Sequence, residues 1–239
     1  FTTVSTAVTL ATPRTFAALT VASGGVLTAK SITVTGALTV QSGGVVTHAV
    51  RDTAGLVLNV TGTLDVQLGG KIDVSAKGLR GGGNNGSSFG NVGEAIDPVT
   101  GAIVAGATDL GSLGAGAAYG GLGGSSSSGS VSNAAYGLLE APSRVGSGGA
   151  GSGGTVGGNG GGRVTIVANS LVLSGQILTN GGVGSTSATG GGGGSGGSVR
   201  IEATSLSGSG QLQANGGASV GSTPAGGGGG GRVAVQYGT

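Results

Sequence analysis

The chain has 239 residues, of which 61 are glycine and none is cysteine or methionine, and its formal net charge is +2. The lack of cysteine excludes disulfides, thiol chemistry and cysteine-ligated metals, and the scattered lysines and arginines argue against nucleic acid as a partner. Charged residues make up only 8% of the chain, so copies repel one another little and self-association is favoured.

A glycine content of about a quarter is often a sign of disorder. Here, however, the glycines gather in runs between stretches rich in valine, leucine and isoleucine. No window keeps a helical spacing of apolar residues without a glycine or a β-branched run interrupting it. The composition therefore predicts an all-β fold with a narrow aliphatic core.

Residues 1–15 are rich in threonine and valine and predict one strand followed by a turn. This strand includes Thr2, Val4, Ala7 and Thr9. It either caps the fold by pairing within the chain or offers an unpaired edge to another subunit. The sequence leaves both possibilities open.

Residues 16–80 contain a short repeat. LTVASGGVLT from Leu19 recurs as LTVQSGGVVT from Leu38, and a looser copy, LDVQLGGKIDV, begins at Leu64. Apolar and polar residues alternate in each copy, which predicts short strands with one buried face, and the Gly-Gly pair supplies a tight corner. The residues expected in the core are Leu19, Val21, Leu38, Val40, Leu64, Val66, Ile72 and Val74.

Residues 81–160 form an excursion rich in glycine and serine with little strand pattern. Two Ala-Ala-Tyr-Gly phrases contain Tyr119 and Tyr136. We expect these tyrosines to anchor the excursion onto the rest of the fold. The alternative is that their rings bind glycans by stacking on sugars.

Residues 161–239 carry the longest repeat. GGRVTI from Gly161, GGSVRI from Gly196 and GGRVAV from Gly230 begin 35 and 34 residues apart, and SLVLSGQILTNGG from Ser170 returns as SLSGSGQLQANGG from Ser205. Such a fixed interval is typical of stacked units that complete their core with a neighbour. We therefore predict a parallel β-helix (β-solenoid), right-handed as such crossovers usually are, with eight to ten coils.

The longer glycine runs exceed what corners need, and their backbone groups must find hydrogen-bond partners. We expect GGGNNG, GSGGAGSGG and the runs near residues 190–197 and 226–231 to lie side by side as polyglycine II-like strands.

The phrases YGLLEAPSRVGSGG, GGGRVTIVA, GGGGSGGSVRIEA and GGGGGGRVAVQY follow one another in this order. Over about residues 75–239 the chain thus resembles the glycine-rich repeat region of large bacterial surface and secreted proteins. The resemblance implies an extracellular location, an adhesive, matrix or structural role, and no catalytic residues. The absence of an initiator methionine predicts a processed mature chain or a piece of a longer one. A secreted chain whose signal peptide has been removed fits this pattern, and a cytoplasmic chain that has lost only its initiator methionine is the alternative. The lack of a long apolar run predicts no membrane insertion.

The leading functional prediction is a non-enzymatic structural protein without cofactors that assembles head to tail into a filament. A glycan-binding adhesin or fibre module is the alternative. A carbohydrate-active enzyme is a third reading, and it would need Asp65, Asp73 or Glu140 to converge in a cleft.

The remaining polar motifs are sparse. His48 is the single histidine, which excludes a histidine-based metal cluster, and we expect it in a loop. Asn59 and Asn85 begin Asn-x-Ser/Thr tripeptides and are possible glycosylation sites.

Overall fold

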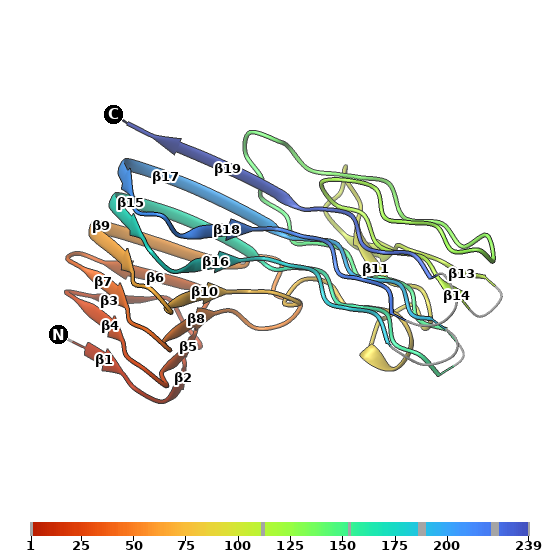
Figure 1. Cartoon of the computed structure of the whole chain (residues 1–239), viewed down its shortest axis with the longest axis horizontal. Coiled ribbons are helices and arrows are strands. Elements are labelled where there is room, and N and C mark those ends of the chain that lie inside the picture. The colour runs from red at the N-terminus through yellow and green to blue at the C-terminus, as the bar shows by residue number, and fades with distance from the viewer. Residues whose placement is uncertain (1, 111–112, 153, 186–189, 221–224, 239) are drawn as a thin grey trace.

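The computed structural model describes residues 2–110, 113–152, 154–185, 190–220 and 225–238 (Figure 1). These residues form an all-β fold whose single helical element is the short 3₁₀ helix η1 (Gly83–Asn85). Most strands pair in parallel within two large sheets. This architecture is compatible with the predicted parallel β-helix.

The strand boundaries are as follows. The nine-stranded sheet contains β1 (Thr2–Val4), β3 (Arg14–Phe16), β4 (Leu19–Val21), β6 (Ser31–Val34), β7 (Leu38–Val40), β9 (Leu56–Val66), β15 (Arg163–Leu173), β17 (Ser198–Ser207) and β19 (Arg232–Tyr237). The six-stranded sheet contains β2 (Ala7–Thr9), β5 (Val26–Thr28), β8 (Val45–Thr47), β10 (Lys71–Asp73), β16 (Gln176–Leu178) and β18 (Gln211–Gln213). Two antiparallel pairs join β11 (Glu94–Ile96) to β12 (Ile103–Ala105) and β13 (Asp109–Leu110) to β14 (Leu113–Gly114).

Copies of the sequence repeats lie directly on one another. Leu19 pairs with Leu38, and Leu38 pairs with Leu64. Farther along the chain, Val164 pairs with Val199, which pairs with Val233. We call such a set of equivalent residues in successive windings a column. The eight core residues expected from the short repeat are all buried, with at most 1% of their surface exposed, so this prediction is confirmed.

The stack has fewer windings than predicted. Each winding contributes one strand to the six-stranded sheet, which gives six windings in the described residues instead of eight to ten. The expectation was wrong because much of residues 81–160 and the glycine runs do not wind with the sheets but extend beside them (Figure 1).

The N-terminal segment also differs from its prediction. Residues 1–15 do not make one strand and a turn. They hold β1, β2 and the start of β3, each three residues long, and these strands form the first winding. Threonines on both faces of such short strands hide the alternation that marks a longer one.

The long strands turn a corner of the stack. The first part of β9 pairs with β6 and its last part pairs with β7. Gly62 lies between the two parts, where a Cβ atom would collide with the carbonyl group of Gly36. The lack of a side chain at Gly62 thus allows β9 to bend and to pair with β6 on one face of the stack and with β7 on the next.

The glycine runs form a second body, drawn to the right of the sheets in Figure 1. We call residues 78–83, 114–124, 146–152, 154–162, 190–197 and 226–231 the glycine bundle. Apart from the start of η1 and the end of β14, these residues belong to no helix or strand, and most of them are assigned neither a turn nor a bend. Backbone hydrogen bonds join them, for example from Gly78 N to Gly160 O (2.7 Å) and from Gly158 N to Gly192 O (2.9 Å). The expected run GGGNNG is extended only at its start, because η1 begins at Gly83.

Candidate functional site: the open ends of the stack

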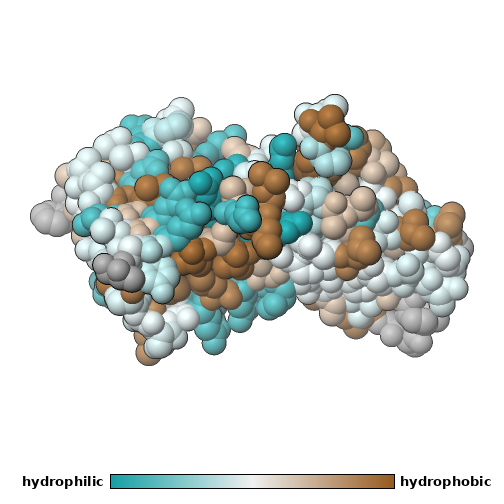
Figure 2. Space-filling model, turned by 90° about the horizontal axis from the view of Figure 1, so that it is seen from above, coloured by the Kyte–Doolittle hydropathy of each residue, from teal (hydrophilic) through white to brown (hydrophobic). Residues whose placement is uncertain are grey.

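The C-terminal end of the stack exposes part of its core. β19 pairs with β17 on one edge, and no described strand pairs with its other edge. Val233 is 39% exposed, whereas Val164 and Val199 in the same column are fully buried. Leu206, Leu212 and Val235 likewise pack against the core but are only partly buried. Seen from above, the largest connected patch of apolar side chains lies on the half of the molecule that holds the sheets, toward its middle, and smaller separate patches lie on the other half (Figure 2).

The N-terminal end is formed by β1, β2 and β3. Thr2 and Val4 pair with Leu19 and Val21, so the partner of β1 lies within the same chain. β2, from Ala7 to Thr9, pairs with β5 in the same way. The opposite edges of these strands have no partner among the residues described. The segment therefore continues the fold on one side and leaves a free edge on the other.

The two ends differ in polarity. In the first winding, Thr2 and Arg14 occupy columns that hold Leu19 and Ile32 in the second winding. Both Thr2 and Arg14 are exposed. At the N-terminal end, polar side chains therefore cover part of the apolar core. At the C-terminal end, the columns finish in partly exposed apolar side chains.

Tyr119 and Tyr136 lie inside the protein. Their exposed fractions are 0% and 5%, and their ring centroids are 4.9 Å apart. The Tyr136 hydroxyl donates to the Val145 carbonyl (2.8 Å), and Arg232 donates to the Tyr136 carbonyl from two nitrogens (3.3 and 3.1 Å). Burial raises the pKa of both phenols. These contacts fit an anchor that ties the excursion to β19, and they leave no ring face on which a sugar could stack.

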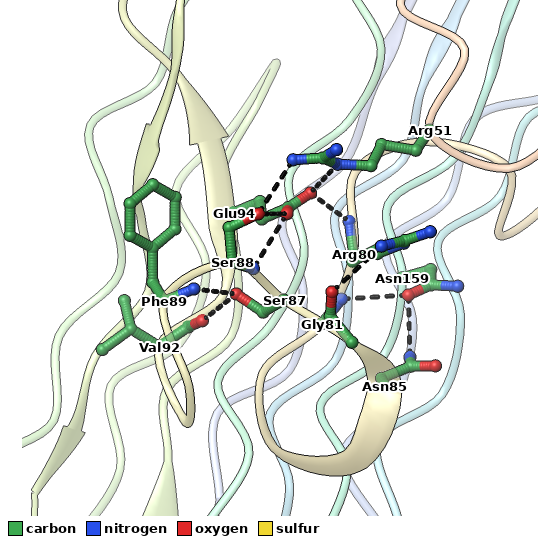
Figure 3. Close-up of polar contacts among 11 residues, drawn as sticks. Arg51, Arg80, Gly81, Asn85, Ser87, Ser88, Phe89, Val92, Glu94 and Asn159 are labelled. Carbon is green, nitrogen blue, oxygen red and sulfur yellow. Dashed lines mark hydrogen bonds and ion pairs between the residues drawn. The ribbon is translucent and has the colours of Figure 1, made fainter.

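A buried carboxylate fixes the start of the excursion (Figure 3). Glu94 accepts hydrogen bonds from Arg51 Nε (2.9 Å), from the backbone of Arg80 (3.1 Å) and from both the backbone and the hydroxyl of Ser88 (3.1 Å each). Burial alone would raise the pKa of Glu94, but these donors outweigh it and lower the pKa. Sequence reasoning missed this group because its ion-pair partner is 43 residues away.

The two possible glycosylation sites have different surroundings. Asn59 lies in β9 and is partly exposed. The Asn85 side-chain nitrogen donates to the Gly157 carbonyl (2.9 Å) and to Asn159 Oδ1 (2.7 Å). A sugar on Asn85 would replace one of the two hydrogens on this nitrogen, so at least one of the hydrogen bonds to the glycine bundle would be lost.

The acidic residues considered for catalysis lie apart. Asp65 is in β9 of the nine-stranded sheet and accepts from Gln67, whereas Asp73 is in β10 of the six-stranded sheet and accepts from the backbone of Ser75. Glu140 stands on an exposed loop. Within the described ranges, no group of three or more His, Cys, Asp or Glu side chains is placed to hold a metal.

His48 directly follows β8 in a loop, as expected, but its side chain is fully buried. Its Nδ1 is 2.8 Å from the Ala49 carbonyl, and its Nε2 accepts from the backbone of Arg163 at 3.2 Å. The ring is therefore neutral with its proton on Nδ1. Burial lowers the pKa of His48, and the positive charge of Lys77 acts in the same direction, while the Ala49 hydrogen bond and Asp52 oppose them.

A surface cavity of about 530 Å³ opens in the excursion. It is lined by Pro98, Tyr136, Gly137, Leu138, Ser143 and Arg144. Leu138 and the neighbouring Leu139 are each about two-thirds exposed.

In the part of the chain that the structure describes, no helix is long and apolar enough to cross a membrane. Comparisons with protein-family models, with curated proteins and with solved structures found no match.

Proposed function

We propose that the protein is an extracellular structural protein that assembles head to tail through its open ends into a filament or surface fibre. The observation that carries this proposal is that β19 at one end and β3 at the other are parallel members of one sheet, each with an edge that no described strand covers. A second copy moved along the stack brings these edges together. Such a contact does not close, so it propagates.

The finer fold assignments belong to the same proposal. We infer that the stack is a right-handed parallel β-helix, in agreement with the strong preference of parallel crossovers. We also infer that the glycine bundle is polyglycine II-like. In support, backbone donors that serve one neighbouring run recur every third residue, as at Gly158 and Gly161, and three residues make one turn of that helix.

The extracellular location and the structural role rest on the resemblance to glycine-rich bacterial surface proteins. No cofactor is needed for this role. The low content of charged side chains supports close contact between copies.

Electron microscopy and sedimentation of the purified chain test the proposal. We expect filaments of the unmodified protein at neutral pH. Val233→Lys places a charge on the open apolar end and should give monomers, whereas Val99→Lys, at a site that is 89% exposed, should still form filaments. A chain that remains monomeric at high concentration contradicts the proposal.

The polarity of the contact can be tested separately by cross-linking. Continuing the columns places Gln236 of one copy beside Thr15 of the next, within the Cα distance that a disulfide spans. Because the chain has no cysteine, a Thr15→Cys/Gln236→Cys variant should oxidise to a ladder of covalent oligomers. Each single variant should give dimers at most.

A glycan-binding module is the second candidate, and the cavity beside Arg144 is the observation that favours it. Glycan-array binding by a monomeric chain, lost on Arg144→Ala and Leu138→Ser, would support this candidate over the first.

A further inference from the structure

Backbone donors in the glycine bundle repeat with the sequence. In two successive windings, two glycine N–H groups three residues apart donate to the run of the next winding. The bonds are Gly158 N to Gly192 O (2.9 Å), Gly161 N to Ser195 O (2.8 Å), Gly193 N to Gly226 O (2.9 Å) and Gly196 N to Gly229 O (2.9 Å). The equivalent donors one repeat later are Gly227 and Gly230.

The N–H groups of Gly227 and Gly230 end this series without an acceptor run, although the carbonyls of both residues accept from the excursion, at Gly227 from Gly124 N (2.8 Å) and at Gly230 from Gly120 N and Gly121 N (3.0 and 3.1 Å). Neither N–H donates to a backbone carbonyl in the part of the chain that the structure describes. At Gly193 and Gly196 a Cβ atom would collide with backbone atoms of the following winding, but at Gly227 and Gly230 the nearest atoms are 3.9 and 4.0 Å away. The described fold thus has room for a side chain at both positions. Glycine there costs backbone entropy without any packing need within this chain.

The unpaired edge of β19 faces in the same direction as the N–H groups of Gly227 and Gly230. Successive windings place β15, β17 and β19 on one another, just as they place Gly158, Gly193 and Gly227 on one another. The strand edge and the two glycines therefore form one continuous surface, which we call the C-terminal docking surface. It consists of residues 227–230 and β19.

We propose that the C-terminal docking surface binds a segment of another chain in which a glycine run leads directly into a short strand with alternating apolar residues. Among the residues described, the two equivalent surfaces, which belong to β15 and β17 with the glycine runs before them, are each covered by a segment of that kind. This inference rests on the proposed function in so far as both use the same end. The first winding of a second copy offers strands but no glycine run, so it covers β19 and leaves Gly227 and Gly230 free. A segment with a glycine run and a strand contacts both β19 and the two glycines. It should therefore displace the first winding of a second copy from this surface.

A labelled peptide with the sequence of residues 226–238 provides the probe, and its binding to the full chain is followed by fluorescence anisotropy. Two control peptides have the same composition. Alanine at the positions of Gly228 and Gly231 should weaken binding about tenfold or more, because these residues face the preceding run and a Cβ atom there meets the carbonyls of Gly194 and Gly197. Alanine at the positions of Gly227 and Gly230, which face away, should leave binding unchanged.

The matching change in the protein is the double variant Gly227→Ala/Gly230→Ala. It should fold with an unchanged Tm, because a Cβ atom at either site meets no atom of the protein closer than 3.9 Å. It should bind the peptide about tenfold more weakly, because the two methyl groups fill the space that the peptide backbone would occupy. Shortening of filaments by the peptide would further support the inference. Equal binding of the two control peptides, unaltered binding by the double variant, or no binding would overturn it. Filament formation by the chain alone reports on the proposed function independently.

Discussion

Glu94 shows how one residue can hold a loop without a hydrophobic core. Its carboxylate is fully buried, yet its pKa is lowered, because four donors and the Arg51 charge replace water. Three of the donors come from Arg80 and Ser88, on either side of η1. The carboxylate thus links this turn to Arg51 in the loop between β8 and β9.

Replacing Glu94 by glutamine should reduce the free energy of unfolding by about 2 kcal/mol. The neutral amide oxygen is a weaker hydrogen-bond acceptor than the carboxylate, and the amide NH₂ group would face donors that already point at this position. The folded-state pKa is lowered, so the stabilisation is present above the unfolded pKa of about 4.3 and is lost as the pH falls below it. Urea denaturation at several pH values measures both effects. Glu140→Gln, on an exposed loop, serves as the control and should change little.

His48 provides a second pH-dependent contribution. The ring stays neutral when folded, whereas the unfolded chain takes up a proton near pH 6.5. Stability should therefore be complete above pH 6.5 and should fall as the pH drops toward 5, with a slope of up to about 1.4 kcal/mol per pH unit. Because the chain has one histidine, His48→Gln should abolish the slope in this window. The same slope in both proteins would contradict this assignment.

At the scale of elements, the excursion is tied down by a small aromatic cluster. Leu79, Ile96 and Val145 surround the two tyrosines, and Arg232 at the start of β19 lies 5.7 Å from the centre of the Tyr119 ring. The two hydroxyls differ. That of Tyr136 is hydrogen-bonded to Val145 and Ser147, whereas that of Tyr119 is buried near the Ser198 hydroxyl and the Arg144 carbonyl without a hydrogen bond of good geometry to any described residue.

This difference predicts opposite results for two similar substitutions. Tyr136→Phe should lower the free energy of unfolding by about 1–2 kcal/mol, because the Val145 carbonyl loses its donor. Tyr119→Phe should be neutral or slightly stabilising, because it removes a hydroxyl that is buried without compensation. Chemical denaturation of the two variants measures the contrast. A larger loss for Tyr119→Phe would show that this hydroxyl has a bonded partner.

At the scale of the whole molecule, backbone contacts within each of the two bodies hold together segments that are far apart in the sequence. Leu79 N donates to Gly146 O (3.0 Å), Gly82 N donates to Gly149 O (2.9 Å), and β15 pairs with β9 along most of its length. The loop containing Glu140 lies between these partners in sequence but is exposed. The chain should therefore tolerate a cut in this loop.

Limited digestion with a glutamate-specific protease tests this expectation. Of the three glutamates, Glu94 is fully buried and Glu202 lies in β17 between two paired strands, which leaves Glu140 as the accessible site. We expect fragments 1–140 and 141–239 to separate on a denaturing gel and to elute together under native conditions. Separation under native conditions would mean that the segments before and after the cut are not held by these contacts.

The sequence predicted well those parts of the fold that repeat. Leu19, Leu38 and Leu64 stack at the intervals read from the printed chain, because each copy has the same alternation and the same glycine corner. The first winding was predicted poorly, because threonine on both faces hides the alternation. The burial of His48 and the contacts of Glu94 were also missed, since Arg163 lies 115 residues from the histidine and nothing local marks such a contact.

The glycine bundle has a thermodynamic consequence. Its segments are joined by peptide groups, and few apolar side chains are withdrawn from water there. The heat capacity of unfolding arises mainly from newly hydrated apolar surface and is usually about 12–15 cal/mol/K per residue. For this chain it should lie below that range, which flattens the dependence of stability on temperature and moves cold denaturation farther from ordinary conditions.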